Sequence, residues 1–252
     1  MAEKFTRKFL KRPDAFLATL RGGYRWTEDH LKAVAMIAVG IFFISAIWLY
    51  ANHRMDKKHR TALAAFYRAE KKFDEKFSAV TAAPKKKAAE AQDVAGQVSE
   101  ELDQIKHVPR DFPKSKGALM SLLKVGDFHA SQKQYALALS SYDEALKMAQ
   151  THFFKILIFY NRGYMYELSE QYPQAVEQFQ KITAINKWRF LFWEFGYRPN
   201  PFWLTSAYFG IGRCYEKLSR PTEAKETYLR IADEFPNTPF ADKAEALALL
   251  IP

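Results

Sequence analysis

The carboxy-terminal half of the sequence repeats one spacing of small and aromatic residues three times. In each copy a glycine is followed 12 positions later by an alanine and 16 positions later by an aromatic residue. This repeated spacing predicts three helix pairs, in which the glycine of the first helix lets the second helix approach, the alanine meets it, and the ring fills the space toward the neighbouring repeat. Closer packing offsets the helix-propensity cost of each glycine, about 1 kcal/mol. We expect these residues to pack the core: Gly126, Ala138, Tyr142, Gly163, Ala175, Phe179, Gly212, Ala224 and Tyr228.

This register resembles that of the tetratricopeptide-repeat (TPR) family. The resemblance implies an all-α fold, a TPR-like right-handed α-solenoid of three to four helix pairs within residues 109–252, whose first helices form a concave face that holds partner segments. Three positions depart from the family pattern: His129 replaces an aromatic residue, Pro221 starts a second helix, and Thr183 replaces a small apolar residue. After the third pair, the apolar spacing from Phe240 to Ile251 predicts a C-terminal capping helix.

Residues 52–108 leave two interpretations open. Helical patterns over 53–78 and 87–106 are separated by an Ala/Pro/Lys stretch at 79–87, and the segment from Pro109 to Pro113 is similar to a boundary between repeats. The two helices form either a degenerate first helix pair or a basic helical stalk that holds the repeats away from a membrane.

Residues 33–51 contain no charged side chain and are mostly Ala, Val, Ile, Phe and Leu. About 20 such residues suffice for a helix to cross the hydrocarbon of a bilayer, so the segment predicts a single transmembrane helix. Trp26 and Trp48, near its two ends, fit the two interfaces. The alternatives are a buried core helix and a cleaved signal peptide. The basic flanks argue against the first, and the long charged leader without a cleavage pattern argues against the second.

Basic residues surround this segment. Residues 1–32 carry eight Lys and Arg against four Asp and Glu, residues 52–90 carry eleven against five, and residues 91–252 carry nineteen of each. Such flanks predict contact with phospholipid head groups, whereas nucleic acid would need a basic face on the folded half. We therefore expect proteins and membrane lipid as partners, and no nucleic acid. Residues 1–32 form either a basic amphipathic helix or a flexible tail.

The basic residues on the two sides of this segment give conflicting predictions of which side of the membrane the repeats occupy. Close to it, the carboxy side holds more Lys and Arg than the amino side, which favours repeats in the cytoplasm. The whole amino tail nevertheless holds eight basic residues that would have to cross as a short segment, whereas long domains cross with little regard to charge. We expect a cytoplasmic N-terminus and a periplasmic TPR domain, with a cytoplasm-facing domain as the alternative.

An insertion separates the second pair from the third. The interval between these pairs is 49 residues, against 37 between the first two, and is about 15 longer than a standard repeat. The insertion, 187–204, is the most aromatic part of the folded half, and Pro199 and Pro201 limit the helices expected in it. Its rings either fold back as a local core or form an exposed surface for a protein partner or the membrane interface. With His129 they are the candidate partner-binding residues: Trp188, Phe190, Phe192, Trp193, Tyr197, Phe202 and Trp203.

The sequence shows no arrangement of residues typical of catalysis. It has no Gly-rich phosphate loop, no nucleophile elbow and no metal-binding His pair at helical spacing. The single cysteine, Cys214, can form no intramolecular disulfide and fits a small buried apolar position. We expect a protein that is not an enzyme and has no cofactor, metal or small-molecule substrate.

The order of the segments carries a second resemblance. A short amino end, one anchor near residue 40, an Ala-rich basic helix and the segment Phe112–Ala118 before the repeats resemble the YfgM-type ancillary subunits of the bacterial Sec translocon. The stretch Phe235–Ala244 is similar to repeat boundaries in envelope-assembly TPR proteins. These resemblances imply the bacterial inner membrane and, as partners, the translocon, periplasmic chaperones or an envelope-assembly complex. The alternatives are a cytoplasm-facing membrane adaptor and a regulatory subunit of a membrane enzyme or transporter.

Overall fold

The computed structural model describes residues 23–24, 26–27, 30–82, 94–185, 187–190 and 193–251, with 187–190 and 193–195 described by their backbone only. The chain divides into two compact units, Met1–Lys57 and Lys58–Pro252. Helix α2 (Leu31–Ala82) contributes residues to both.

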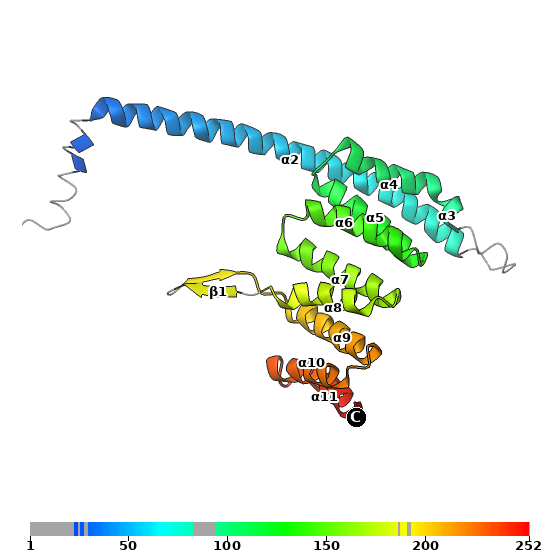
Figure 1. Ribbon diagram of the computed structural model, residues 1–252. Helices are drawn as coiled ribbons and strands as arrows, with labels where there is room; N and C mark the ends of the chain where they lie inside the picture. The colour runs from blue at the N-terminus through cyan, green and yellow to red at the C-terminus, as the bar shows by residue number, and fades with distance from the viewer. Residues whose placement is uncertain are drawn as a thin grey trace, which may run out of the picture. The chain divides into compact units, whose positions relative to one another are not determined.

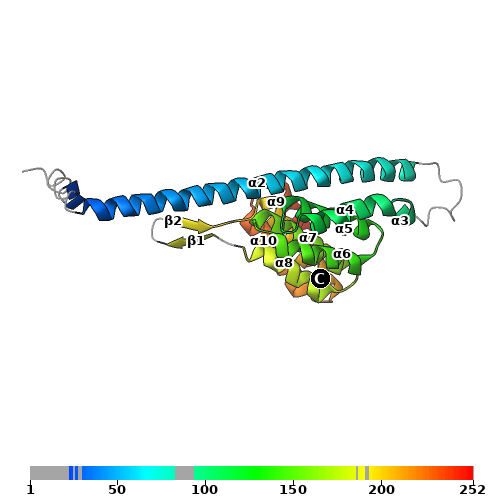
Figure 2. The same cartoon turned by 90° about the horizontal axis from the view of Figure 1, so that it is seen from above.

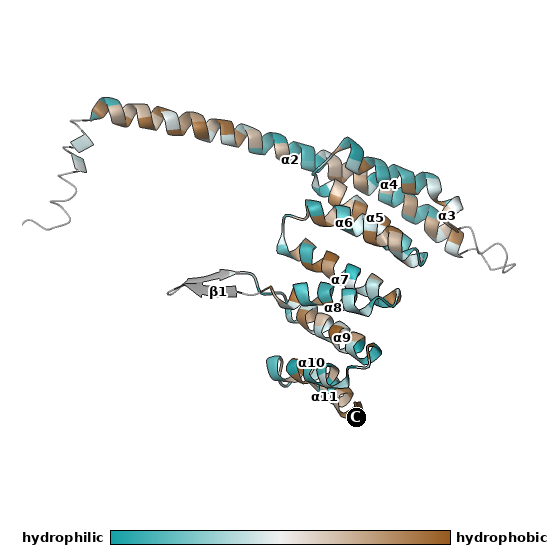
Figure 3. Ribbon diagram, viewed as in Figure 1, coloured by the Kyte–Doolittle hydropathy of each residue, from teal (hydrophilic) through white to brown (hydrophobic). Residues whose placement is uncertain are grey.

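The described part of the first unit consists mainly of the amino-terminal part of α2, which is predominantly hydrophobic (Figure 3). The most apolar 18-residue window of this helix is 0% buried, and large side chains such as Ile37, Phe42 and Trp48 are exposed. The structure therefore does not support the buried core helix that the sequence left open. By length and composition alone, this helix is able to cross a membrane.

The second unit contains the carboxy-terminal part of α2 and a succession of helix pairs (Figure 1). After α3 (Val94–Gln97) and α4 (Ser99–Asp111), three pairs follow, and α11 (Pro239–Leu250) packs on the last of them. The predicted TPR-like helical repeats are thus confirmed. The three pairs are α5 (Lys116–Ser131) with α6 (Tyr135–Met148), α7 (His152–Leu168) with α8 (Tyr172–Thr183), and α9 (Pro201–Lys217) with α10 (Pro221–Glu234).

Each repeated glycine lies against the ring at the repeated aromatic position of its own pair. A Cβ atom added to Gly126 would lie 2.5 Å from Cε1 of Tyr142, and Gly212 stands in the same relation to Tyr228. The repeated rings and alanines are at most 1% exposed. The ring of the second helix therefore occupies the space that a side chain on the first helix would need.

Phe179 of the middle pair makes this contact on two sides. Its Cε1 atom would lie 2.6 Å from a Cβ at Gly163 in its own pair, and its Cε2 atom would lie 2.6 Å from a Cβ at Gly210 in α9. One ring thus joins the second pair to the third.

The turns repeat as regularly as the core. Lys133, Glu170 and Ser219, each seven positions after a repeated glycine, have φ between 55° and 60° and end the first helix of each pair. A left-handed residue at this place is a common way to end a helix, although glycine adopts it at lower cost.

The carboxy-terminal part of α2 packs with α4 against α5. Its buried Phe66 and Phe73 belong to one apolar cluster with Leu102 and Ile105 of α4 and Phe128 of α5. Residues 58–82 and 99–111 therefore form a further helix pair at this end of the stack.

Two boundaries differ from those expected. Helix α2 continues to Ala82, so it covers the start of the break expected at 79–87. Pro109 lies inside the last turn of α4, which ends at Asp111, so the break before α5 begins within the expected segment Pro109–Pro113 but after its first residue. A proline removes one backbone hydrogen bond, but here it falls in the last turn, where few bonds remain to be lost.

The described residues are helical as expected, except that the insertion contains a short antiparallel hairpin. Strand β1 (Lys187–Phe190) pairs with β2 (Trp193–Gly196) (Figure 2), and the register places Trp188 opposite Phe195. Aromatic residues favour extended backbone, and this preference prevails in a segment without helical periodicity.

The expected insertion also ends earlier than residue 204. Pro201 begins α9, so Phe202 and Trp203 belong to a repeat helix. Proline is favoured at the first position of a helix, where its missing N–H group has no partner to lose.

We expect Gly163→Ala to destabilise the protein by about 1–3 kcal/mol, because Gly210 holds the far edge of the Phe179 ring and the ring cannot move away. Thermal unfolding of the full chain in a mild detergent, followed by circular dichroism, measures this change. Gly40→Ala is the matched control, since nothing lies within 4 Å of a Cβ at Gly40. Equal unfolding temperatures for the two variants would contradict the packing argument.

Candidate functional site

Polar side chains link the first helices of successive pairs. At the amino-terminal end of the stack, Nζ of Lys124 on α5 lies 2.8 Å from Oδ1 of Asp74 and 3.3 Å from Oε1 of Glu70, both on α2. Between α5 and α7, Nδ2 of Asn161 donates a hydrogen bond of 3.4 Å to Oδ1 of Asp127. These contacts lie on one side of the stack, where first helix meets first helix.

The same side carries a bidentate ion pair between α7 and α9. Arg213 donates from Nε to Oε1 of Glu167 at 2.7 Å and from Nη2 to Oε2 at 2.8 Å. The hydrogen bonds that Arg213 donates to Glu167 raise the pKa of Arg213. Two parallel bonds fix the orientation of both groups. We call this side the first-helix face and define it by six residues: Lys124, Asp127, Asn161, Tyr164, Glu167 and Arg213.

Two of the packing rings also hold carboxylates of the first helices. The Tyr142 hydroxyl donates a hydrogen bond of 2.6 Å to Oδ1 of Asp127, and the Tyr228 hydroxyl donates to Oε1 of Glu216. Burial raises the pKa of Asp127, while the hydrogen bond from Tyr142 lowers it. Phe179 has no hydroxyl, so its ring makes no such bond. The sequence analysis assigned these rings to packing alone. The presence of Tyr rather than Phe at two of the three positions could have indicated that a hydroxyl there has a hydrogen-bond partner.

His129 lies in a cavity of about 360 Å³ between α4, α5 and α6. Its Nδ1 atom is 2.7 Å from Oε1 of Gln134, and Lys106 and Arg110 of α4 line the same cavity. At the equivalent position of the third pair, Tyr215 lines a cavity of about 280 Å³ between α8, α9 and α10. The structure thus does not bring His129 together with the described rings of the insertion.

The candidate rings of the insertion have different surroundings. Tyr197 and Trp203 are half-buried and pack against the core of the second and third pairs, whereas Phe202 is 54% exposed. The local-core interpretation therefore fits Tyr197 and Trp203, and the exposed-surface interpretation fits Phe202. The side chains of the four other candidates lie outside those that the structure describes: Trp188, Phe190, Phe192 and Trp193.

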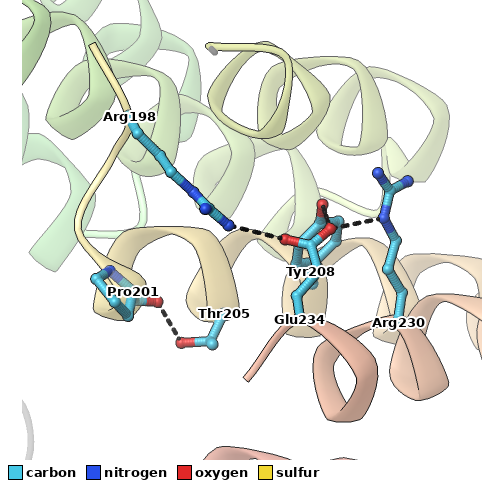
Figure 4. A network of polar contacts seen from close by, with 6 residues as sticks. All are labelled: Arg198, Pro201, Thr205, Tyr208, Arg230 and Glu234. Atoms are coloured by element: carbon cyan, nitrogen blue, oxygen red, sulfur yellow. Dashed lines mark hydrogen bonds and ion pairs between the residues drawn. The ribbon is translucent and has the colours of Figure 1, made fainter. Parts of the chain in front are cut away.

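A polar network fastens the segment after the hairpin to the third pair (Figure 4). Glu234 of α10 accepts hydrogen bonds of 2.9 Å from the Tyr208 hydroxyl and from Nε of Arg230, and its other oxygen lies 3.6 Å from Nη2 of Arg198. Burial and the bond to Glu234 raise the pKa of Tyr208 to about 12, so this hydroxyl stays protonated at neutral pH. Asn200 then caps α9 by accepting a bond of 2.8 Å from the Phe202 N–H.

Groups suited to metal or thiol chemistry are few in the part of the chain that the structure describes. Within it, no three His, Cys, Asp or Glu side chains are grouped as metal ligands. Cys214 is fully buried, and burial raises the pKa of its thiol to about 12.

A comparison with protein families agrees with the register of the third pair. Residues 206–238, which cover most of α9 and all of α10, match the family model described as tetratricopeptide repeat. A solved structure of the N-terminal domain of stress-induced protein-1 (STI-1) from C. elegans is similar at 16% sequence identity and a TM-score of 0.40, over 52% of this chain and 94% of that one. No curated protein matches the chain. The chain therefore carries TPR-like helical repeats, one of which the family model matches directly.

We expect Tyr142→Phe to lower the free energy of unfolding by about 1 kcal/mol, because Asp127 would lose its shortest hydrogen bond at a site that is partly shielded from water. Denaturant unfolding of the full chain in detergent measures the loss. The control is Tyr164→Phe, which alters an exposed ring of the same face. A loss of equal size in both variants would show that the Asp127 contact contributes nothing specific.

Proposed function

We propose that this chain is a membrane-anchored scaffold that binds other proteins through its TPR-like repeats. The observation that carries the proposal is the succession of helix pairs in one register, whose first helices are linked by polar contacts into one face. Repeats of this kind position partners and provide an extended binding surface. One family match and the helix-pair register support the repeats, and the exposed apolar part of α2 supports the anchor.

The first-helix face is the surface that we propose for partner binding. Its fixed charges, Lys124 beside two carboxylates and Arg213 paired with Glu167, would orient a partner segment. Tyr164 is 43% exposed, and Leu168, one turn further along α7, is 42% exposed, so apolar contact area adjoins the charges. Exposed aromatic residues next to arginine are typical of the residues that dominate binding energy in protein interfaces.

The anchor and the cellular setting are further parts of the proposal. The apolar part of α2 is not buried within the described residues, and the length of residues 33–51 matches the hydrocarbon thickness of a bilayer. By resemblance, we propose the bacterial inner membrane with a cytoplasmic N-terminus and periplasmic repeats that serve a translocon, a chaperone or an envelope-assembly complex. The basic residues just after the apolar segment favour the second candidate, an adaptor whose repeats face the cytoplasm. Under either orientation we propose binding rather than catalysis.

Site-specific photocrosslinking in native membranes tests the binding surface. A photoreactive phenylalanine in place of Tyr164 should crosslink to a discrete protein partner, because this side chain is exposed on the proposed face. The same residue in place of Leu229 of α10, which is 42% exposed, is the matched control. Equal crosslinking from both positions, or none from Tyr164, would contradict a specific role for the first-helix face.

Protease protection tests the orientation. Added protease should digest the repeats in spheroplasts with an intact inner membrane if they face the periplasm. Full protection in spheroplasts, with digestion only after lysis, would instead establish the cytoplasm-facing adaptor.

A further inference from the structure

Two helices of the stack begin with an exposed ring at the same repeat position. Phe153 of α7 and Phe202 of α9 each lie ten positions before the repeated glycine of their helix. Phe153 is 50% exposed and Phe202 is 54% exposed, whereas the next residue in each helix packs into the core. Because the two positions are equivalent in register, both exposed rings lie at the same edge of the stack, where the first helices begin.

Further aromatic contacts lie at this edge. Tyr197, in the segment between the hairpin and α9, stacks on His152 at the start of α7, with ring centroids 5.2 Å apart and an interplanar angle of 3°. Trp203 meets Phe202 edge-on at 5.3 Å. We call these five residues the aromatic edge: His152, Phe153, Tyr197, Phe202 and Trp203.

Basic residues accompany the aromatic edge. Lys116 occupies the position of Phe153 and Phe202 in α5, Lys155 lies two residues after Phe153, and Lys147 is in the last turn of α6. Arg198 follows Tyr197 directly. Carboxylates at the same end of the helices include Asp111 of α4, Asp233 and Glu234 of α10, and Asp242 of α11, and Glu234 is already bonded to Arg230 and near Arg198. Arg110 and Lys181, in the last turns of α4 and α8, add to the basic residues of this end. The edge therefore has a positive surplus.

We propose that the aromatic edge lies in the head-group region of a bilayer containing anionic phospholipid. Aromatic side chains favour the membrane interface, and neighbouring Lys and Arg favour anionic lipid. This inference rests on the proposed membrane anchor, which keeps a bilayer at high effective concentration near the repeats, so that weak contacts suffice. Interleaved rings and basic groups at helix ends are the chemistry of an interfacial contact.

The test measures the depth of single labelled positions in lipid vesicles. The fluorophore NBD, attached to a cysteine in Phe153→Cys or Phe202→Cys, reports whether that position lies within the bilayer, because lipids that carry a nitroxide group near the head group or in the acyl chains quench it. The native thiol does not interfere, since burial and the raised pKa of Cys214 keep it unreactive at neutral pH. The full chain is reconstituted in phosphatidylcholine vesicles with or without phosphatidylglycerol.

We expect both labels to be quenched at least about twofold more than a label at Leu229→Cys, and more strongly when phosphatidylglycerol is present. Leu229 is the control because it is exposed on α10 at a different place in the repeat. Quenching no greater than at Leu229 would overturn the proposal. So would an NBD emission shift without lipid quenching, which would indicate a protein contact.

A label at Ser45→Cys, within the apolar part of α2, separates this inference from the proposed function. Strong quenching at Ser45 with none at Phe153 or Phe202 would refute the interfacial edge and leave the anchor standing. No quenching at Ser45 would refute the anchor itself. Circular dichroism of each variant shows whether the helices are retained.

Discussion

The helix pairs of this protein depend on contact between the bare backbone of a glycine and the face or edge of an aromatic ring. At Gly126, Gly163 and Gly212 the ring of the second helix stands where a Cβ atom would be. Dispersion contacts with a buried ring are individually small but numerous, and they require this close approach. The distance between the two helices of a pair is therefore set by the ring, and the position of every first helix follows from it.

The sequence allowed the helical repeats to be predicted because burial at these positions restricts the residue type. A position that admits only glycine, followed at fixed spacing by a small residue and a ring, is visible in the sequence alone. The hydrogen-bond partner of a buried hydroxyl cannot be predicted from sequence spacing in the same way. The hydroxyls of Tyr142 and Tyr228 reach carboxylates that lie on another helix, and no spacing rule pointed to Asp127 or Glu216.

Other features escaped prediction because local signals competed. The sequence analysis treated the apolar segment and the amphipathic segment after it as separate elements, because their hydrophobic patterns differ. No proline separates them, and in the structure they form one helix from Leu31 to Ala82. In the insertion, the density of rings was evident, but aromatic residues are compatible with a core helix and with a strand. Pro201 was expected to limit helices within the insertion and instead begins α9. His129 was named with the insertion as a candidate partner-binding residue, and the structure does not bring it together with the described rings Tyr197, Phe202 and Trp203.

The polar contacts of the first-helix face complement the ring packing. A single surface ion pair contributes little to stability, about 0–1 kcal/mol, so these contacts are not what holds the stack together. Their effect is on geometry. The Arg213–Glu167 pair, the Asp127–Asn161 bond and the contacts of Lys124 each bridge two first helices and fix how their side chains are presented. A face that is ordered before a partner arrives loses less side-chain entropy when the partner binds.

The double contact of Phe179 has a consequence for how the array comes apart. In a linear array, stability is the sum of the intrinsic term of each unit and a coupling term between neighbours. A ring enclosed by Gly163 on one side and Gly210 on the other belongs to that coupling term, since separating α9 from α8 would expose it to water. Opening that starts at the terminal helix α11 would therefore meet its steepest free-energy step when it reaches α9. Beyond that step, the middle and third pairs would melt as one cooperative segment rather than one after the other.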